Sequence, residues 1–322
     1  MITISSNSWI GIWIGLEINL ISFIPLILEN RLNNSEANLN YFLIQAISSS
    51  ALLFSIIFNL IIFKNWTILS NLFSYLTIFS LIIKIGAAPF HWWIINVSEN
   101  VKWLSLIILL IWQKVAPLVL INYLNKVTLL LHIIIFINSL IGSLGGINQT
   151  SLRKILTFSS INHIGWIFSS IILSEIIFLS YFIIYSFLNI CVILLFNFNQ
   201  SFYLRQINFS IINSIFLKFY FSISILSLGG LPPFLGFLPK WIIIERIVSN
   251  FYNLVTLFLV ITSLLTLRFY LNIVINSFIF NSHILNWLIN LNLITNTKII
   301  WLSFSIICSI FLFFFIILNF II

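Results

Sequence analysis

The sequence predicts an all-α, polytopic membrane protein of about ten transmembrane helices, and three observations carry this prediction. Of the 322 residues, 61% are hydrophobic and only 6% are charged, whereas a soluble domain is about one quarter charged. Apolar runs of about 20 residues, long enough to cross a hydrocarbon core, recur from one end of the chain to the other. Two longer runs are interrupted by glycine and proline, which is typical of broken helices in transporters.

Ten apolar spans follow one another along the chain. They lie near residues 7–28, 41–63, 68–98, 102–123, 127–148, 154–174, 176–198, 212–248, 253–278 and 300–321. The first span contains Glu17 and has no small-residue cleavage site, so it is not typical of a cleaved signal, and no Arg-rich transit segment precedes it. We treat residues 1–322 as a single integral-membrane domain.

The third and eighth spans (68–98 and 212–248) are too long for one straight crossing. The third is interrupted at GAAPF, residues 86–90, and the eighth at GLPPF, residues 230–234. From the order of the spans, we expect the two broken helices to cross the membrane in opposite directions. This pattern predicts an antiporter-like inverted repeat whose site lies beside the breaks. Two unrelated proline kinks are the alternative, because kinks are common in membrane helices.

The connecting segments predict the orientation. With alternating crossings, one side of the membrane collects Arg31, Lys102, Arg153, Lys154, Arg205 and Lys298, and the other collects Lys64, Lys126 and Arg246. The first side is therefore predicted to be the inner one, since basic residues gather on the inner side of membrane proteins. Both termini then face outward.

Several functions are disfavoured by what the chain lacks. The 14 basic residues are dispersed, so the net charge of +8 does not indicate nucleic-acid binding. The sequence has no aspartate, no C-x-x-C and no G-x-G-x-x-G, and Cys191 and Cys308 lie inside apolar spans. We therefore expect no metal, iron–sulfur cluster or dinucleotide in this chain, and any redox chemistry must belong to partners.

Lys114 stands in the middle of the apolar stretch ILLIWQKVAPLVLI. It lies roughly 18 Å along a helix axis from Lys102 and 12 Å from Asn122, too far for its side chain to reach water at either end. A lysine at this depth costs at least ~2.5 kcal/mol, so it should face the bundle interior. Pro117 leaves the carbonyl of Gln113 without its helical donor, which adds local polarity. A buried lysine can exchange a proton, whereas arginine stays charged; a fixed structural ion pair is the alternative.

Three further charges lie at membrane depth. Glu17 is about 15 Å from either end of its span, Lys84 comes two residues before the first break, and Lys240 follows the second break. A carboxylate and three lysines in such positions favour a hydrated row of titratable groups, the mark of an ion pathway or proton relay.

Histidine and tryptophan give weaker signals. His91 adjoins the first break, and His163 lies in FSSINHIGW beside several polar residues, so either could extend a relay. Each could equally be a hydrogen-bonded contact between helices. Trp66, Trp92, Trp93 and Trp301 are interpreted as aromatic-belt residues at the membrane interface.

Five stretches together resemble a known family: WIGLEINLISFIPL, KIGAAPFHWW, WQKVAPL, GGINQTSLRKILTFSSINHIGW and LGGLPPFLGFLPKW. They are similar to the subunit 2 family of mitochondrial NADH:ubiquinone oxidoreductase, respiratory complex I, in its animal, insect-type form. The resemblance covers residues 5 to 275 in the same order. That family is similar in turn to the membrane subunits of Mrp-type cation/proton antiporters, which accounts for the inverted repeat.

The resemblance implies roles for the charged residues. Glu17 corresponds to the family's carboxylate that pairs electrostatically with the lysine at Lys84. Lys114 corresponds to the central channel lysine, and Lys240 to the lysine near the exit route. Protons would move through these groups in turn, with His91 and His163 as further candidates, driven by redox chemistry in other subunits.

The resemblance also implies the setting. NADH, FMN, iron–sulfur clusters and ubiquinone would be bound by partner subunits, with no cofactor and no metal in this chain. The partners would be other membrane-arm subunits and the lipid bilayer of the mitochondrial inner membrane, with cardiolipin as a candidate lipid, and no nucleic acid.

The start of the chain departs from the family, because many members carry a further N-terminal helix ahead of the GLEINL span and this chain has only about six residues there. Either the start is truncated in this lineage or the first helix has been lost, and we expect the contacts of that helix with neighbouring subunits to differ here. Two other functions stay open at this point: a free-standing cation/proton antiporter, and a structural subunit whose charged residues only hold helices together.

Overall fold

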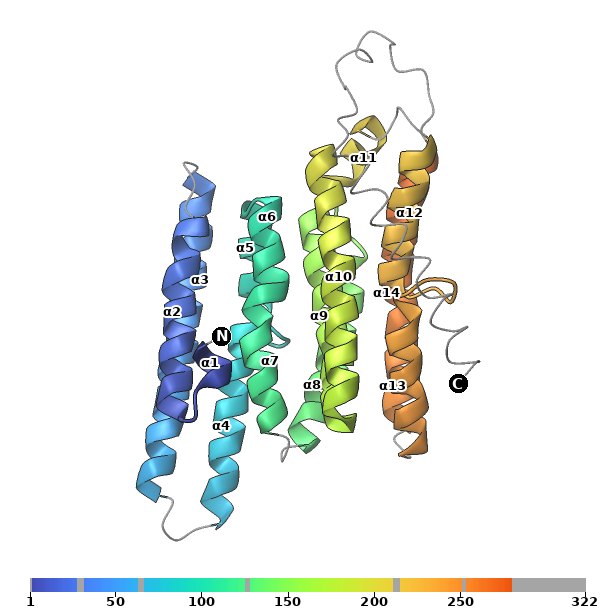
Figure 1. Ribbon diagram of the computed structural model, residues 1–322. Coiled ribbons are helices and arrows are strands. Elements are labelled where there is room, and N and C mark those ends of the chain that lie inside the picture. Colours follow the sequence, from blue (N-terminus) through green and yellow to red (C-terminus); the bar gives the residue numbers. More distant parts are fainter. Residues whose placement is uncertain are drawn as a thin grey trace.

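The computed structural model describes residues 2–27, 32–62, 67–124, 128–210, 215–250 and 253–279. These residues are almost entirely helical and contain no strand, only an isolated bridge between Ser151 and Tyr203. Most of the helices run side by side along one direction (Figure 1). The all-α fold is confirmed. The helices are α1 (Ile2–Ser5), α2 (Trp9–Ile27), α3 (Leu32–Ile62), α4 (Thr67–Ile85), α5 (Trp92–Asn100), α6 (Trp103–Ile107), the π-helix η1 (Ile108–Trp112), α7 (Gln113–Tyr123), α8 (Thr128–Gly146), α9 (Leu152–Leu173), α10 (Glu175–Asn199), α11 (Leu204–Ser210), α12 (Ile215–Gly229), α13 (Phe237–Ser249) and α14 (Asn253–Ile279).

Within the described residues each expected span corresponds to a helix or a helix pair, although α3 begins at Leu32, nine residues before the expected second span. Seven of the helices are long and apolar enough to cross a membrane, counting α6, η1 and α7 as one. The third and eighth spans correspond to two helix pairs, α4 with α5 and α12 with α13. The tenth expected span, 300–321, lies outside the described residues.

The two breaks have the same local structure. In the first, the amide of Gly86 donates to the carbonyls of Ile82 and Ile83, and the amide of Ala87 donates to Ile82. In the second, the amide of Gly230 donates to the carbonyls of Leu226 and Ser227, and the amide of Leu231 donates to Leu226. This is the same pattern 144 positions later. Gly86 and Gly230 have φ values of 72° and 78°, so each first half-helix ends on a left-handed glycine, the usual helix C-terminal motif. The helix pairs run in opposite directions in Figure 1, as an inverted repeat requires.

Irregular backbone at membrane depth should be buried in protein, and the two breaks meet this requirement only in part. Gly86, Ala87 and Ala88 are buried, but Pro89 is exposed, and Pro232 and Pro233 of the second break are exposed as well. Proline has no backbone N–H. An exposed proline therefore leaves no N–H unpaired, and the carbonyl of Pro89 is bonded to His91 Nδ1. Both features lower the free-energy cost of irregular backbone in lipid.

The interpretation of Trp93 as a belt residue is wrong. Its side chain is buried, and its indole Nε1–H donates to the carbonyl of Ile83, 3.1 Å away. It thereby ties α5 to the last turn of α4 across the first break. Trp92 is 71% exposed, as a belt residue should be, whereas Trp66 and Trp301 lie outside the described residues. Adjacent helical positions point about 100° apart, so only one of the pair can face lipid.

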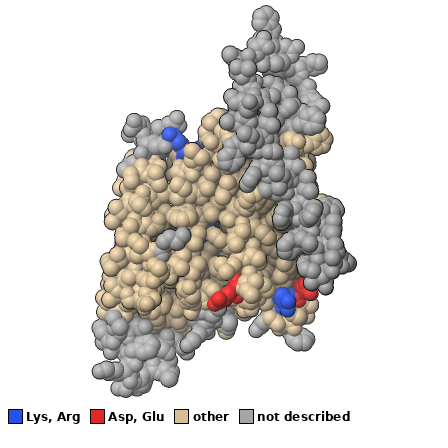
Figure 2. Space-filling view, viewed as in Figure 1, with Lys and Arg blue, Asp and Glu red and all other residues tan. Residues whose placement is uncertain are grey.

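On the face shown in Figure 2, the charged side chains of the described residues lie near the two ends of the bundle, and the surface between them is almost uncharged. The α5–α6, α8–α9 and α10–α11 connections all lie at the upper end in Figure 1. Lys102 is in the first of them, Arg153 and Lys154 are in the first turn of α9, and Arg205 is in the first turn of α11. There Lys154 pairs with Glu99 at 2.7 Å, and Arg153 donates to the carbonyl of Val101 at 2.7 Å. Arg246 lies near the opposite end, in the last turn of α13. The remaining basic residues used for the orientation, Arg31, Lys64, Lys126 and Lys298, lie outside the described residues.

Candidate functional site

The four charged residues predicted to lie at membrane depth are spread across the bundle. Glu17 lies on α2, Lys84 on α4, Lys114 on α7 and Lys240 on α13. In Figure 1 α2, α4, α7 and α13 follow one another from one side of the bundle to the other. The three lysine side chains are buried. The inverted repeat therefore sets the charged groups in a row through the bundle instead of gathering them in one pocket.

Lys84 and Glu17 form the first pair. They lie within electrostatic reach of each other but do not form a direct salt bridge. Lys84 is in the last turn of α4, and its backbone carbonyl accepts a hydrogen bond from Gln45 of α3 at 3.1 Å. This bond satisfies one of the carbonyls that the end of α4 leaves without an intrahelical partner. Gln45 thus fixes the half-helix that carries Lys84.

Lys114 is the most enclosed of the lysines, with 1% of its surface exposed. Its ammonium donates to Ser160 Oγ of α9 at 3.1 Å. Ser160 itself donates to the carbonyl of Thr157. The partner of Lys114 is therefore a neutral hydroxyl, and among the described residues no carboxylate is paired with it. The π-helix η1 ends directly before Gln113 and Lys114, and such segments are frequent at functional sites.

His163 is a third buried titratable group, on the same helix as Ser160. Its Nδ1 is hydrogen-bonded to the Tyr181 hydroxyl of α10 at 2.8 Å, and the ring is within electrostatic reach of both lysines. It sits on α9, in which 18 of the 22 residues are buried in the bundle. A group that can both accept and donate a proton is therefore buried within electrostatic reach of both lysines.

Lys240 lies on the far side of the second break. Its ammonium donates to the carbonyl of Gly229 at 2.9 Å and lies 5.8 Å from the centre of the Trp166 ring. Gly229 is the last residue of α12, so the charge also complements the negative end of the helix dipole. This geometry allows a structural role for Lys240 beside a chemical one.

The structure does not join His91 to the row. Its Nδ1–H donates to the carbonyl of Pro89 at 3.0 Å, and its ring packs on Trp92. Both contacts belong to the first break and the start of α5. Within the described residues, His91 therefore stabilises the break and is not hydrogen-bonded to another candidate residue.

An amide pair that the sequence did not suggest joins α2 to the start of α7. Asn19 Nδ2 donates to Gln113 Oε1 at 2.6 Å, and Gln113 Nε2 donates back to Asn19 Oδ1 at 3.3 Å. The residues are two positions from Glu17 and one from Lys114. They fix the helix carrying the carboxylate against the helix carrying the central lysine.

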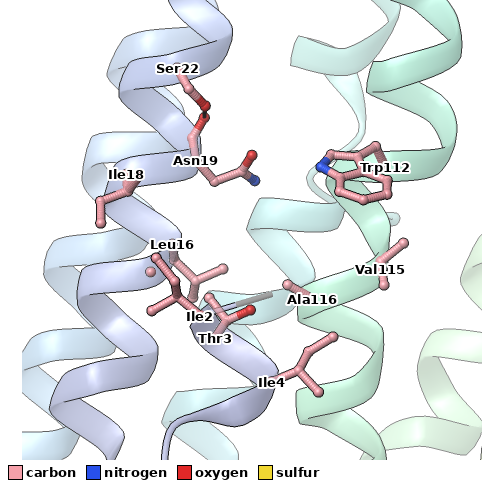
Figure 3. Close-up of a pocket in the computed structure, with 11 residues that line it drawn as sticks. Ile2, Thr3, Ile4, Leu16, Ile18, Asn19, Ser22, Trp112, Val115 and Ala116 are labelled. Atoms are coloured by element: carbon pink, nitrogen blue, oxygen red, sulfur yellow. Dashed lines mark hydrogen bonds between the residues drawn. The ribbon is translucent and has the colours of Figure 1, made fainter.

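A groove of about 310 Å³ opens on the flank of the bundle, lined by residues of α1, α2, η1 and α7. Figure 3 shows Asn19 and Trp112 facing each other across it. A neighbouring pocket of about 400 Å³ shares Asn19, Ser22 and Trp112 and also reaches Gln113. The walls are mainly apolar. Among the described residues no three His, Cys, Asp or Glu side chains gather where they could hold a metal ion.

The sequence of residues 6–266 matches the family described as "NADH:quinone oxidoreductase/Mrp antiporter, TM". The chain belongs to this family. A relative from Anopheles gambiae named "NADH-ubiquinone oxidoreductase chain 2" is 45% identical over 309 residues, 95% of this chain and 90% of the relative. A Locusta migratoria protein of the same name is 39% identical, and the match covers 91% of this chain and 86% of that protein. The insect-type resemblance is confirmed.

Solved structures share the fold of this family member. A chain of respiratory complex I from Thermus thermophilus has a TM-score of 0.77 at 20% identity, covering 86% of this chain and 67% of its own. A chain of the Mrp complex from Dietzia has a TM-score of 0.73 at 18% identity. The match covers 84% of this chain and 56% of the Dietzia chain. The antiporter-like architecture is therefore confirmed independently of the sequence motifs.

Proposed function

We propose that this chain is a proton-translocating membrane subunit of an NADH:ubiquinone oxidoreductase. Glu17 and Lys84 form the input pair, Lys114 is the central proton carrier, His163 links it onward, and Lys240 hands the proton toward the exit. His91 contributes only through the first break. NADH, FMN, iron–sulfur clusters and ubiquinone are bound by partner subunits, so this chain itself carries no redox step. It acts as one antiporter-like domain of the mitochondrial inner membrane, among other membrane-arm subunits and lipids such as cardiolipin.

The contact between Lys114 and Ser160 is the observation that carries this proposal. A fully buried ammonium with a neutral partner is not held in its charged form by a carboxylate, so it is free to load and release a proton as nearby charges change. A lysine suits this task because an arginine would stay protonated. His163, which responds to both lysines, supplies the next acceptor.

The test is Lys114→Met in the assembled complex. Methionine keeps an apolar stem and removes only the titratable group. Ser160 keeps its hydrogen bond to Thr157, so no buried polar group is left unpaired and assembly should be near normal. NADH-driven proton uptake per assembled complex should fall by about 100-fold or more, the scale of a lost proton-transfer group. The measurement is proton uptake in sealed vesicles, normalised to the amount of assembled complex.

The control is Lys102→Met, since Lys102 is exposed and lies at the N-terminus of α6, beyond the membrane-spanning part. It should pump at the wild-type rate. Normal pumping by Lys114→Met complexes would refute the carrier role. Loss of the assembled complex in Lys114→Met alone would favour a structural role, in which the bond from Lys114 to Ser160 holds α7 against α9.

A free-standing cation/proton antiporter is the second candidate, favoured by the shared fold with the Mrp complex chain. The two differ in a simple measurement. The purified chain alone, reconstituted in vesicles, should show no exchange of Na⁺ for H⁺ if it works only inside an oxidoreductase. Exchange by the isolated chain would favour the antiporter.

A further inference from the structure

Arg268 is a charged residue at membrane depth that the bundle does not enclose. It belongs to α14, one of the seven helices long and apolar enough to cross a membrane. By helical rise it lies about 22 Å from Asn253 at the start of this helix and about 17 Å from Ile279 at its end. Its side chain cannot reach water at either end from this position. Yet it is exposed on the surface of the bundle, whereas the three lysines of the candidate site are buried.

The contacts of α14 fix this depth independently. A Cβ added at Gly229 would lie 3.5 Å from the Tyr270 ring and 3.9 Å from Cδ1 of Leu267, the residue before Arg268. Gly229 is the last residue of α12, directly before the second break. In Figure 1 the connection between α12 and α13 lies away from both ends of the bundle. Arg268 is therefore level with the second break, inside the membrane-spanning region.

The exposed face of α14 around Arg268 is mostly apolar. From 257 to 275 the exposed residues are Leu257, Val260, Ile261, Leu264, Arg268, Asn272 and Ile275. Apart from Val260, they recur at intervals of three or four residues, so they form one strip along the helix. We call these seven residues the Arg268 strip. An apolar strip alone would be an ordinary lipid-facing surface, and the arginine is what distinguishes this one.

Lipid is a costly cover for the Arg268 strip. An arginine stays charged in proteins, and a charged side chain at membrane depth almost always faces protein or a water-filled cavity. The guanidinium presents N–H donors in a planar fork that matches the two oxygens of a carboxylate. We therefore expect a protein surface with a carboxylate to lie against the strip.

This chain does not supply that carboxylate. Among the described residues, no acidic side chain is ion-paired with Arg268. The chain has six acidic residues, all glutamates, and none follows Arg268 in the sequence. Glu17, the glutamate that lies at membrane depth, is on α2, at the opposite side of the bundle from α14 (Figure 1). The matching acceptor must therefore come from another chain.

We propose that the Arg268 strip is the contact surface for a transmembrane helix of another membrane subunit, and that a carboxylate of this helix pairs with Arg268. The inference rests on the proposed function in one respect, the assembly of this chain with other membrane subunits, and it assigns the face at which one of them binds. Asn272, one turn beyond Arg268, offers an amide to the same helix. A single polar position in an apolar seam fixes the register of two helices, so the ion pair selects the partner helix and places it.

Facing lipid and facing a partner predict opposite effects of removing the charge. In lipid, a neutral side chain replaces a costly charge, so the variant should be at least as stable as the wild type. At the proposed interface, the same change leaves the carboxylate of the partner buried without its cation, which is strongly destabilising. No ion pair within the described part of the chain holds Arg268, so the fold of the chain itself should not depend on it.

The experiment measures the amount and the thermal dissociation of the assembled complex for Arg268→Gln and Arg268→Lys. Arg268→Gln should lower the assembled amount by about ten-fold or more, since truncating one member of a buried interfacial charge pair is costly. Arg268→Lys keeps the charge and loses only the fork, so it should retain most of the assembled complex. The matched control is Arg205→Gln, since Arg205 is also exposed but lies in the first turn of α11, at the upper end of the bundle. It should assemble as the wild type does.

A density map of the wild-type complex gives a second readout that needs no variant. A carboxylate of another chain within about 4 Å of the Arg268 guanidinium supports the inference. A lipid headgroup, ordered water or residues of this chain alone around Arg268 overturn it. Arg268→Gln complexes that assemble in normal amounts and dissociate at the wild-type temperature or above overturn it as well.

The outcomes separate this inference from the proposed function. Those Arg268→Gln complexes that do assemble should take up protons at the wild-type rate per complex, because Arg268 lies outside the row of charged groups. Normal assembly of Arg268→Gln together with blocked uptake in Lys114→Met refutes the interface and leaves the function standing. Loss of assembly in Arg268→Gln alone, together with normal uptake by Lys114→Met, supports the interface and refutes the carrier role.

Discussion

At the scale of single residues, the partner of a buried lysine indicates what the lysine does. Lys114 donates to a neutral hydroxyl, whereas Lys154 at the end of the bundle pairs with the carboxylate of Glu99. An ion pair holds a proton in place, and a hydroxyl holds it only weakly. Of the two, Lys114 therefore has the environment of an exchanging group and Lys154 that of an anchor.

Lys240 combines both roles, and two substitutions separate them. Lys240→Arg keeps a cation near the Gly229 carbonyl but cannot release its proton, so the complex should assemble while proton uptake is lost. Lys240→Met also leaves the Gly229 carbonyl without its donor, at about 1–3 kcal/mol, so the assembled amount should fall as well. The measurements are proton uptake and thermal dissociation of the complex. Normal uptake in the arginine variant would restrict Lys240 to capping α12.

At the scale of elements, the two breaks depend on glycine. Gly86→Ala and Gly230→Ala each force a side chain into left-handed backbone, at roughly 1–2 kcal/mol. The added Cβ would also lie 3.1 Å from Ile94 Cβ in the first case and 2.9 Å from the Lys240 ammonium in the second. We expect a lower thermal stability of the complex in both variants, and a larger loss of proton uptake for Gly230→Ala.

The control for stability is Gly229→Ala, whose Cβ would meet nothing closer than 3.5 Å and whose residue ends a regular helix. Its thermal stability should match the wild type or exceed it. Equal stability in all three variants would show that the glycine conformations do not limit the breaks.

The breaks were predictable from the sequence because their cause is local. Glycine supplies the left-handed residue and proline stops the helix, whatever surrounds them. The π-helix before Lys114 was not predictable, since no residue type in ILLIW marks it. The contact beside it is the amide pair with Asn19, which comes from 94 positions away.

The hydrogen-bond partners of the site residues could not be predicted from the sequence either. Ser160 stands in a helix whose serines are all buried, and only packing decides which of them faces Lys114. The same holds for Tyr181, the partner of His163, since nothing in its composition distinguishes it within its apolar span. The charged residues could be found because a charge at membrane depth is costly wherever it points.

At the scale of the whole molecule, the row of charged groups runs across the bundle, whereas the clusters of charge at its ends mark the two membrane surfaces. Lys102 and Lys154 lie at one end, together with Arg153 and Arg205. The positive-inside tendency places that end on the inner side.

This orientation can be tested on the unmodified protein with an amine reagent that cannot cross membranes. In sealed vesicles whose inner surface faces the medium, the reagent should modify Lys102, which is exposed, faster than Lys154, which is held by Glu99. In vesicles of the opposite orientation both should be protected, while Lys64 and Lys126, expected on the outer side, become accessible. Lys114 should stay unmodified in both, because 1% of its surface is exposed. The readout is mass spectrometry of the modified lysines. The reverse pattern for Lys102 would show that the orientation is the opposite one, and that Lys240 delivers protons in the opposite direction.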